Sequence, residues 1–399
     1  MNVLMVGLDD AVFLGDNGPG NTAVRLRRYL ETMRRAEPDS TLTYLVFTRE
    51  RHRPLSLGDG LWFVPVRALR LQLFPWAGLW TIWPLRPCLQ PDVITTQDPL
   101  EAGLLGLMLK RVFRASLEVQ IHFNLLSPYW RAEHRRWNRV RQLLARFVLT
   151  HADAIRVVSS PLKHMLMETW GIPEERMAVL PVPVFYESQP ETPGLADPQV
   201  LSGLHRRVVL FVGRFYYPKN LPGLFTVIER VLHASPDVEF VLVGDGPERP
   251  YATGRAAALD RQRIHVVGYA PYTDLAHYYR RADVLVLPSL YEGFGRVVLE
   301  GYLFDTPAVA TRCGGPEDII VDGETGFLTG IEDMEGFADR VLWLLNHPGV
   351  ARQMGERGHV YVQRAFEPEG LIEQMVGQWR RMYSSALAAV ETDETAIHT

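Results

Sequence analysis

The sequence predicts a two-domain α/β protein in which each domain is built on a parallel sheet. Three observations predict this class. Short β-branched runs alternate with segments of helical periodicity, this alternation occurs twice, and a proline-rich stretch without periodicity separates the two series. The 399 residues are enough for two cores, and the composition, 47% apolar and 22% charged, is that of a globular chain. Disordered, collagenous and coiled-coil proteins are therefore excluded.

The first series begins at the amino terminus. Its β-branched runs are bounded by turn residues, and its longer segments carry apolar residues at helical spacing. The expected strands are 2–6, 42–47, 92–95, 115–121 and 153–158, and the expected helices are 22–33 and one that begins near Ser160. Strands and helices that alternate in this way form parallel sheets with crossover helices.

A polar linker follows the first series. Residues 181–203 contain five prolines and no periodicity, which is typical of a connection between domains. We therefore expect a Rossmann-like N-terminal domain over 1–185, a linker over 186–206 and a Rossmann-like C-terminal domain over 207–366. Residues 367–399 are expected to form a helix that returns to the N-terminal domain and ends in a polar tail.

The second series repeats the pattern of the first. Its expected strands are 208–212, 238–243, 264–267 and 283–287, and its expected helices include 275–281, 297–304 and 368–389. A further helix is indicated by the apolar residues of one helical face, Leu224, Val227, Ile228, Val231 and Leu232. Doubly wound sheets bind ligands beyond the carboxyl ends of their strands, so we expect the functional residues in the strand-to-helix loops.

Charge and cysteine content limit the cellular setting. Residues 1–190 hold 23 Lys and Arg against 18 Asp and Glu, so the front half of this acidic chain is basic. Cys88 and Cys313 are too few for a disulfide framework and have no C-x-x-C spacing, which favours a reducing compartment. No signal peptide, membrane-spanning segment, metal site or nucleic-acid partner is predicted. We expect a cytoplasmic protein.

The most specific motif is PSLYEGFGRVVLE, residues 288–300, directly after an apolar strand. Gly293 and Gly295 let the backbone approach a ligand closely, and the helix that follows presents free N–H groups, so a phosphate can bind there. Glu292 and Glu300 are good acceptors for the hydroxyls of a sugar and a ribose. The alternative is that Glu292 only favours the helix start and that Glu300 is a solvated helix residue.

A pair of cations follows the first strand of the same domain. Arg214 and Lys219, in VGRFYYPKN, stand five residues apart on a strand-to-helix loop, where both can turn towards a diphosphate. The alternative is a solvated turn, which is the commoner place for a single Arg or Lys. Other strand ends carry the glycine turns VGDGP and VVGY, against which a base or a ribose can pack.

Taken in order, these motifs resemble one family. The series VGRFYYPKNLPGL, VLVGDGPE, VVGYAP, DVLVLPSLYEGFGRVVLE and CGGPEDIIVDGETGFL is similar to that of the family 4 glycosyltransferases of the GT-B fold. The resemblance implies two facing Rossmann-like domains with a deep interdomain cleft and a C-terminal helix. It also implies a nucleotide-sugar donor in the C-terminal domain, an acceptor in the N-terminal domain, retention of the anomeric configuration, and no cofactor or essential metal.

The resemblance also assigns roles to individual residues. Arg214 and Lys219 are expected to bind the donor diphosphate and to stabilise its charge as the glycosidic bond breaks, and Glu292 is expected to hold hydroxyls of the donor sugar. The loop GDNGPGN, which includes Gly18, is expected to approach the donor phosphate; its G-x-x-G-x-G spacing is not the dinucleotide fingerprint. The other expected donor-binding residues are Gly213, Gly244, Tyr269, Gly293, Phe294, Gly295 and Glu300.

His122, in VQIHFN, follows the expected strand 115–121. The resemblance implies that this histidine lies near the transferred sugar and completes the catalytic set. Its role would be a hydrogen bond to a sugar hydroxyl, because in the same-face mechanism proposed for this fold the departing diphosphate takes the proton of the acceptor. The alternative is a core histidine that is bonded to the backbone.

A basic amphipathic segment, Trp130 to Thr150, indicates a membrane surface as a partner. One helical face is expected to carry Trp137, Val140, Leu144, Phe147 and Val148, and the other Arg131, Arg135, Arg139, Gln142 and Arg146. Such a helix can lie on an anionic membrane with its aromatic rings among the headgroups. The Trp- and Pro-rich stretch 69–87 is a second candidate contact. The alternative is a helix that packs on its own sheet with a solvated basic face.

The combined expectation is a retaining hexosyltransferase. It would move a sugar from a nucleotide-diphosphate sugar to a glycan or lipid-linked acceptor of a cell-surface polysaccharide or glycolipid, in the cytoplasm at the inner face of the cell membrane. Two alternatives stay open: a nucleotide-sugar epimerase of the same fold, and a non-catalytic nucleotide-sugar-binding partner subunit. The joint presence of Arg214, Lys219, Glu292 and Glu300 argues against the second alternative.

Overall fold

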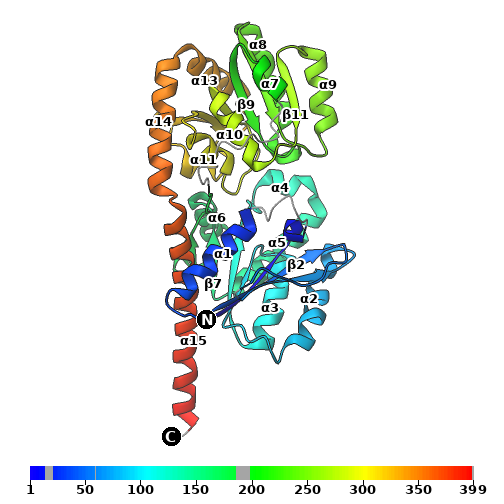
Figure 1. The fold of residues 1–399 in the computed structure, drawn as a ribbon, viewed down its shortest axis with the longest axis vertical. Helices are drawn as coiled ribbons and strands as arrows, with labels where there is room; N and C mark the ends of the chain where they lie inside the picture. The colour runs from blue at the N-terminus through cyan, green and yellow to red at the C-terminus, as the bar shows by residue number, and fades with distance from the viewer. Residues whose placement is uncertain (14–20, 59, 186–197, 398–399) are drawn as a thin grey trace. The chain divides into compact units, whose positions relative to one another are not determined.

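The computed structural model describes residues 1–13, 21–58, 60–185 and 198–397. Its contacts divide the chain into two compact α/β units, each with a sheet of its own (Figure 1). The first unit comprises Met1–His122, His134–Phe185 and Pro368–Thr399, and the second comprises Phe123–Glu133 and Tyr186–Glu367. The predicted fold class, two α/β domains on parallel sheets, is confirmed.

The first sheet has eight strands in the order β3-β4-β2-β1-β5-β6-β7-β8, and all neighbours are parallel except β3 and β4. The strands are β1 (Asn2–Gly7), β2 (Thr41–Thr48), β3 (Leu55–Ser56), β4 (Leu61–Arg67), β5 (Val93–Thr96), β6 (Ser116–Ile121), β7 (Ala154–Val157) and β8 (Met177–Val179). The sequence analysis did not predict β3, β4 and β8. Two of them are only two or three residues long, and Pro65, which has no N–H for a ladder bond, obscures the pattern of β4.

Helices flank the first sheet. They are η1 (Asp10–Phe13), α1 (Asn21–Arg34), η3 (Leu71–Leu73), α2 (Phe74–Ile82), η4 (Trp83–Leu85), α3 (Glu101–Phe113), α5 (Arg135–His151), α6 (Ser160–Trp170), η5 (Glu174–Arg176) and α15 (Pro368–Ile397). Helix α2 packs closely on α3, because a Cβ on Gly78 would lie 2.3 Å from Cδ2 of Leu105. The opposite side of α2 is exposed, including Trp76 and Trp80.

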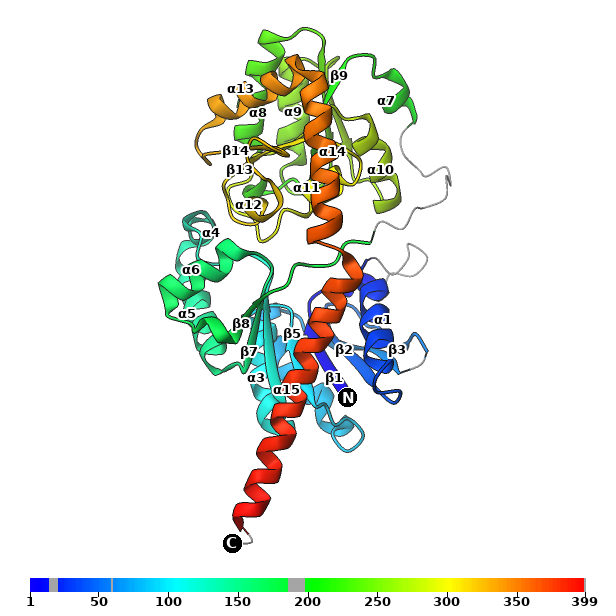
Figure 2. The same cartoon turned by 90° about the vertical axis from the view of Figure 1, so that its left-hand side faces the viewer.

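Helix α15 lies against the first sheet beside α1 (Figure 2). It buries Trp379 completely, and the indole ring meets Tyr29 edge-on at a centroid distance of 5.2 Å. Trp379 Nε1 donates to Glu118 Oε2 at 3.0 Å, and Gln378 Nε2 donates to Glu118 Oε1 at 2.7 Å. These bonds join α15 to strand β6 of the first sheet. They also give partners to the Glu118 carboxylate, which would be costly to bury without them.

The second sheet has six parallel strands in the order β11-β10-β9-β12-β13-β14. They are β9 (Arg207–Val212), β10 (Val238–Val243), β11 (Ile264–Gly268), β12 (Val284–Leu287), β13 (Ala308–Thr311) and β14 (Gly326–Thr329). The central strands read as almost continuous apolar runs, because helices cover both faces of the sheet. The chain leaves β9 towards one edge through β10 and β11 and then returns to β12, which also pairs with β9.

In its described residues, the second unit contains one helix from within the first half of the chain and nine from residue 198 onwards. They are α4 (Pro128–Glu133), α7 (Pro198–Gly203), η6 (Tyr217–Lys219), α8 (Leu221–Ala234), α9 (Arg249–Leu259), α10 (Tyr272–Arg281), α11 (Arg296–Tyr302), α12 (Pro316–Ile319), α13 (Met334–Asn346) and α14 (Pro348–Ala365). Helix α7 lies inside the expected linker. The apolar face expected for α8, including Leu224, Ile228 and Val231, is buried in the core.

The segment Trp130 to Thr150 does not form the single amphipathic helix that its pattern predicts. It is divided at His134, whose extended φ of −141° separates α4 from α5. In α5 the buried residues include Asn138, Ala145 and Val148, while Trp137, Val140 and Phe147 of the expected apolar face are exposed. Helical periodicity identifies residues that share a face, but the packing against α3 decides which face is covered.

Candidate functional site

The loops that carry the predicted donor residues lie together at the carboxyl ends of the central strands of the second sheet. Strands β9 and β12 are neighbours, and the chain runs outward from them in opposite directions. This is the topological switch point, at whose carboxyl side doubly wound sheets bind ligands. Arg214 and Lys219 follow β9, and Glu292, Gly293 and Gly295 follow β12.

Hydrogen bonds hold these two loops against each other. Leu290 N donates to the carbonyl of Pro218 at 2.8 Å, and the Asn220 side chain donates to the carbonyl of Pro288 at 3.1 Å. Asn220 has a left-handed backbone (φ 53°), and its Oδ1 also accepts from Gly223 N at 3.1 Å, which caps helix α8. Asn220 therefore ends the loop of Lys219, caps helix α8 and binds the loop of Glu292.

Lys219, from the loop after β9, and Glu292, from the loop after β12, form an ion pair. Their side chains are 13% and 14% exposed, and Ser289 Oγ donates to the same Glu292 oxygen, Oε1, at 2.8 Å. Burial alone would lower the pKa of Lys219, but the charge and the hydrogen bond of Glu292, together with smaller contributions from Tyr216 and Cys313, raise the pKa above its usual value. Glu292 Oε2 has no donor among the described residues, so one carboxylate oxygen is available to a ligand.

Arg214 is exposed beside the pair. Its guanidinium lies 5.4 Å from the ring centre of Tyr216, and it makes no ion pair with any residue in the described part of the chain. Burial raises the pKa of Tyr216, and this hydroxyl also interacts with the charges of Lys219, Glu292 and Arg214. The structure thus places both predicted cations and the predicted acid around one tyrosine.

The glycine motif has a left-handed backbone at Gly295, and the helix that follows is shorter than expected. Gly295 has φ 82° and precedes α11, whose seven residues fall short of the expected 297–304 at the C-terminal end. The amides of Gly293, Phe294 and Gly295 have no hydrogen-bond acceptor within the described residues. A second glycine makes room behind this loop, because a Cβ on Gly315 would lie 2.1 Å from Cα of Phe294.

Glu300 is a buried residue of α11 and is only 3% exposed, so it is not the solvated helix residue of the alternative interpretation. Tyr279 donates to Oε2 at 2.7 Å, and Arg296 Nε donates to Oε1 at 2.5 Å. Each carboxylate oxygen of Glu300 therefore already accepts one hydrogen bond, and the Arg296 side chain that binds Oε1 is 36% exposed. The role of Glu300 in ribose binding stays a prediction.

The other predicted donor residues occupy neighbouring strand ends. A Cβ on Gly244, which has φ 149°, would lie 1.9 Å from the carbonyl oxygen of Gly213, so these two turns touch through backbone. Tyr269 follows the edge strand β11 and is 76% exposed. Gly18 lies outside the described residues.

Among the described residues, no group of three or more His, Cys, Asp or Glu side chains is arranged to hold a metal ion.

Comparison with known families accounts for both halves of the chain. The family model described as "Glycosyltransferase Family 4" matches residues 18–187, and that described as "Glycosyl transferases group 1" matches residues 197–360. The chain belongs to the group 1 (family 4) glycosyltransferases. The resemblance recognised from the motifs is therefore confirmed, and members of this family are transferase enzymes.

Individual relatives agree with this family. The "Lipopolysaccharide core biosynthesis glycosyltransferase LpsE" of Rhizobium meliloti is 34% identical over 167 residues, 42% of this chain and 47% of that protein. The chain matches about half the length of the first curated relatives.

Solved structures of low sequence identity share the GT-B fold. Sucrose-phosphate synthase from Thermosynechococcus elongatus has a TM-score of 0.81 at 21% identity and covers 96% of this chain and 100% of its own. Anabaena Alr3699/HepE in complex with UDP-glucose has a TM-score of 0.70 at 18% identity and covers 95% of this chain and 98% of its own.

In this glycosyltransferase, His122 directly follows β6 in the first unit and is part-buried. Its Nε2 lies 3.0 Å from Gln120 Oε1, so its partner is a side chain, whereas the core-histidine alternative expected a backbone partner. Burial and, after it, the charges of Arg156 and Arg25 hold the pKa of His122 well below its usual value. The imidazole is therefore neutral at pH 7 and can accept a hydrogen bond.

Sequence reasoning missed several partners of the predicted residues. Ser289 and Tyr279 hold the two glutamates, and Tyr291 donates to Glu133 of α4 at 2.9 Å. Ser289 lies within the quoted motif, three residues before Glu292, and could have been found there. Tyr279 and Glu133 lie far from their partners in sequence, and no local pattern of the glycosyltransferase indicates them.

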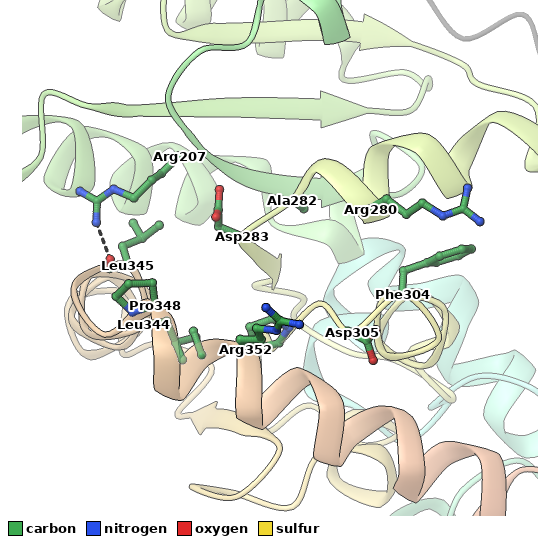
Figure 3. Close-up of a pocket in the computed structure, with 12 residues that line it drawn as sticks. Arg207, Arg280, Ala282, Asp283, Phe304, Asp305, Leu344, Leu345, Pro348 and Arg352 are labelled. Atoms are coloured by element: carbon green, nitrogen blue, oxygen red, sulfur yellow. Dashed lines mark hydrogen bonds between the residues drawn. The ribbon is translucent and has the colours of Figure 1, made fainter.

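A pocket of about 300 Å³ lies at the opposite edge of the second sheet (Figure 3). Arg207, Asp283 and Pro307 line it at or just before the first residues of β9, β12 and β13. Its guanidinium groups already have partners in the protein: that of Arg207 donates to the carbonyl of Leu345, and that of Arg280 lies 4.9 Å from the Phe304 ring centre. This pocket is separate from the predicted donor residues of the glycosyltransferase.

Proposed function

We propose that this protein is a retaining glycosyltransferase that uses a nucleotide-diphosphate sugar. The observation that carries the proposal is the Lys219–Glu292 ion pair at the switch point of the second sheet. A cation and an acceptor side by side match the two parts of such a donor, an anionic diphosphate and a sugar rich in hydroxyls.

The residues suggest how the donor is held. Lys219 supplies a buried point charge and Arg214 an exposed fork of donors to the diphosphate, while the amides of Gly293 to Gly295 offer further donors. Oε2 of Glu292 accepts from a hydroxyl of the sugar. The ion pair also keeps the cation charged in a buried place and ready for the diphosphate.

These groups would lower the barrier of the transfer step. The bond between the anomeric carbon and the diphosphate oxygen breaks, and a bond from the acceptor oxygen forms on the same face. The acceptor proton passes to the departing diphosphate, whose growing negative charge Lys219 and Arg214 stabilise. Neutral His122 accepts from a substrate hydroxyl and removes no proton.

Donor binding is tested by thermal unfolding in a panel of UDP-, GDP- and ADP-sugars. At a concentration of about 100 Kd, we expect the matching donor to raise the Tm by about 3 °C or more, because a ligand of the native state stabilises it. The Lys219→Met variant should lose this shift, and Lys163→Met, which removes an ion pair between α6 and the exposed Glu174 of η5, should keep it. No shift with any nucleotide sugar would contradict the proposal, and acceptor-independent epimerisation would favour the epimerase.

We also propose that the acceptor belongs to a cell-surface glycan or glycolipid at a membrane. An aromatic-basic patch on the first unit supports this. Its exposed apolar residues are Leu69, Leu73, Trp76, Trp80, Trp83, Leu85, Trp137, Val140, Leu143 and Phe147. They come from the stretch 69–85 and from α5, which meet at a depression lined by Arg70, Gln72, Leu73 and Trp137.

Arginines stand among the aromatic rings of this patch. Arg70, Arg86, Arg139 and Arg146 are exposed, and Arg86 lies 4.4 Å from the Trp83 ring centre. Exposed aromatic side chains with cations are typical of proteins that lie in the headgroup zone of anionic membranes. No helix within the described ranges is long and apolar enough to cross a bilayer.

Sedimentation with liposomes tests the patch. We expect binding to vesicles that contain phosphatidylglycerol at low salt, weaker binding at high salt, and about tenfold weaker binding for Trp80→Ser, because 85% of this side chain is exposed and can enter the headgroup zone. The control Tyr251→Ser, an exposed aromatic residue of α9 in the second unit, should bind as the wild type does. Absence of binding to anionic vesicles at low salt would exclude the membrane proposal.

A further inference from the structure

A buried hydrogen-bond network leads to His122 from inside the first sheet. Arg156 of β7 is 2% exposed and donates through Nε and Nη2 to the carbonyls of Leu180 and Pro181 at 2.7 and 2.8 Å. Its Nη1 donates to Gln120 Oε1 on the neighbouring strand β6 at 3.1 Å. Each of the three guanidinium nitrogens thus donates a hydrogen bond, which holds the arginine in a single orientation.

This contact determines the orientation of the Gln120 amide. A guanidinium only donates hydrogen bonds, so the glutamine atom that faces it must be the carbonyl oxygen. The amide nitrogen then points to the other side, where it donates to Thr95 Oγ1 at 2.9 Å. Thr95 in turn donates to Glu118 Oε2 at 2.6 Å. Both ends of the amide have partners of the matching kind.

The same oxygen determines the tautomer of His122. Its Nε2 lies 3.0 Å from Gln120 Oε1, which is an acceptor, so Nε2 must carry the proton. The groups that bear on the imidazole are Gln120 from its own strand, Arg156 from β7 and Arg25 from α1. Two are cations, and both disfavour a second proton on the ring. Nδ1 therefore keeps its lone pair.

We propose that Gln120 and Arg156 are positioning residues for catalysis, which hold His122 as the neutral Nε2–H tautomer so that Nδ1 accepts a hydrogen bond from a substrate hydroxyl. The tautomer follows from the geometry alone, and the contact with the substrate rests on the proposed function. No bond to His122 forms or breaks, and the residue selects the orientation of a hydroxyl by accepting from it.

The tautomer is measured without any substrate by ¹⁵N NMR of the full chain, with the His122 signals assigned by comparison with His122→Gln. We expect a protonated Nε2 and an unprotonated Nδ1 at pH 7, with no change down to about pH 6, where an ordinary histidine is largely charged. A protonated Nδ1, or an imidazolium at about pH 6, would overturn the positioning role whatever the enzyme does. This result does not depend on the proposed function.

Kinetics of transfer then test the role in the reaction. In Gln120→Met the acceptor for Nε2 is lost, so we expect a mixed tautomer and a kcat/KM about tenfold lower, whereas Gln353→Met, at an exposed position of α14, should be unchanged. In Arg156→Met the loss of the charge should raise the pKa of His122 and add an acidic limb to the pH–rate profile, which Arg156→Lys should not show.

The outcomes separate the two claims. An Nε2–H tautomer with unchanged kinetics and pH profile in both Gln120→Met and Arg156→Met would overturn the positioning role while leaving donor binding intact. If Arg156→Met does not fold, Gln120→Met decides, because it leaves the bonds of the guanidinium to Leu180 and Pro181 in place. If the wild type binds no nucleotide sugar, the proposed function fails instead.

Discussion

Replacing Lys219 with methionine is expected to lower kcat/KM for sugar transfer by about a hundredfold to a thousandfold, the range found when one charge-stabilising donor is removed from an active site. The ammonium lies beside Glu292 on a side chain that is 13% exposed, and Lys219 is the less exposed of the two predicted cations. Without it, the departing diphosphate loses the charge that lies nearest the sugar-binding carboxylate. The rate is measured with the donor identified by thermal unfolding, from the release of the nucleoside diphosphate.

Two further variants separate chemistry from stability. In Lys219→Met the Glu292 carboxylate, whose side chain is 14% exposed, loses its cation, and such an unpaired charge destabilises the fold. The free energy of unfolding is therefore measured together with the rate. The double variant Lys219→Met, Glu292→Gln removes the unpaired charge and should regain stability but not activity. The control Lys163→Met, whose ion-pair partner Glu174 is exposed, should match the wild type in both measurements. Wild-type kcat/KM in Lys219→Met would disprove the donor-site assignment.

Replacing Trp379 with alanine is expected to lower the free energy of unfolding by about 3–5 kcal/mol. The side chain is fully buried between α15 and the first sheet, and its Nε1 donates to Glu118 Oε2 at 3.0 Å. Burial raises the pKa of Glu118, so the loss of a donor adds to the cost of keeping this carboxylate charged. Urea unfolding measures the difference.

Matched variants show where this stability originates. Trp379→Phe keeps most of the buried ring but loses the N–H, so we expect a smaller loss of about 1–2 kcal/mol. Trp80→Ala removes a side chain that is 85% exposed and should change the free energy of unfolding by less than about 0.5 kcal/mol. A loss below about 1 kcal/mol in Trp379→Ala would mean that α15 contributes little to the first unit.

Local sequence patterns predicted most elements of both sheets. Predominantly apolar runs such as β1, β9 and β10 were located to within a residue or two, because strands buried on both faces are rich in apolar side chains. Short strands such as β8 were not predicted, because three residues carry too little pattern. The exposed Trp137 of α5 shows a different limit, because periodicity does not reveal which face a neighbouring helix covers.

The candidate site was predicted residue by residue, but its internal bonds were not. Arg214, Lys219 and Glu292 were named from motifs at strand ends, and the structure brings them around Tyr216. The Lys219–Glu292 pair joins residues 73 positions apart, and the pairing of Glu300 with Tyr279 joins residues 21 apart. Such contacts depend on the order of strands in the sheet, which the motifs do not encode.

By itself, the sequence determined the family, the two α/β halves and the residue types at each strand end, because these depend on local composition and on the order of motifs along the chain. Only the tertiary structure decided that Oε2 of Glu292 has no donor among the described residues, that Trp379 and Glu118 meet across 261 positions, and that Gln120 turns its carbonyl to Arg156 and His122. The physical reason is that hydrogen-bond direction and burial belong to neighbours in space, and each of these groups acquires its state from residues that lie on other strands and helices.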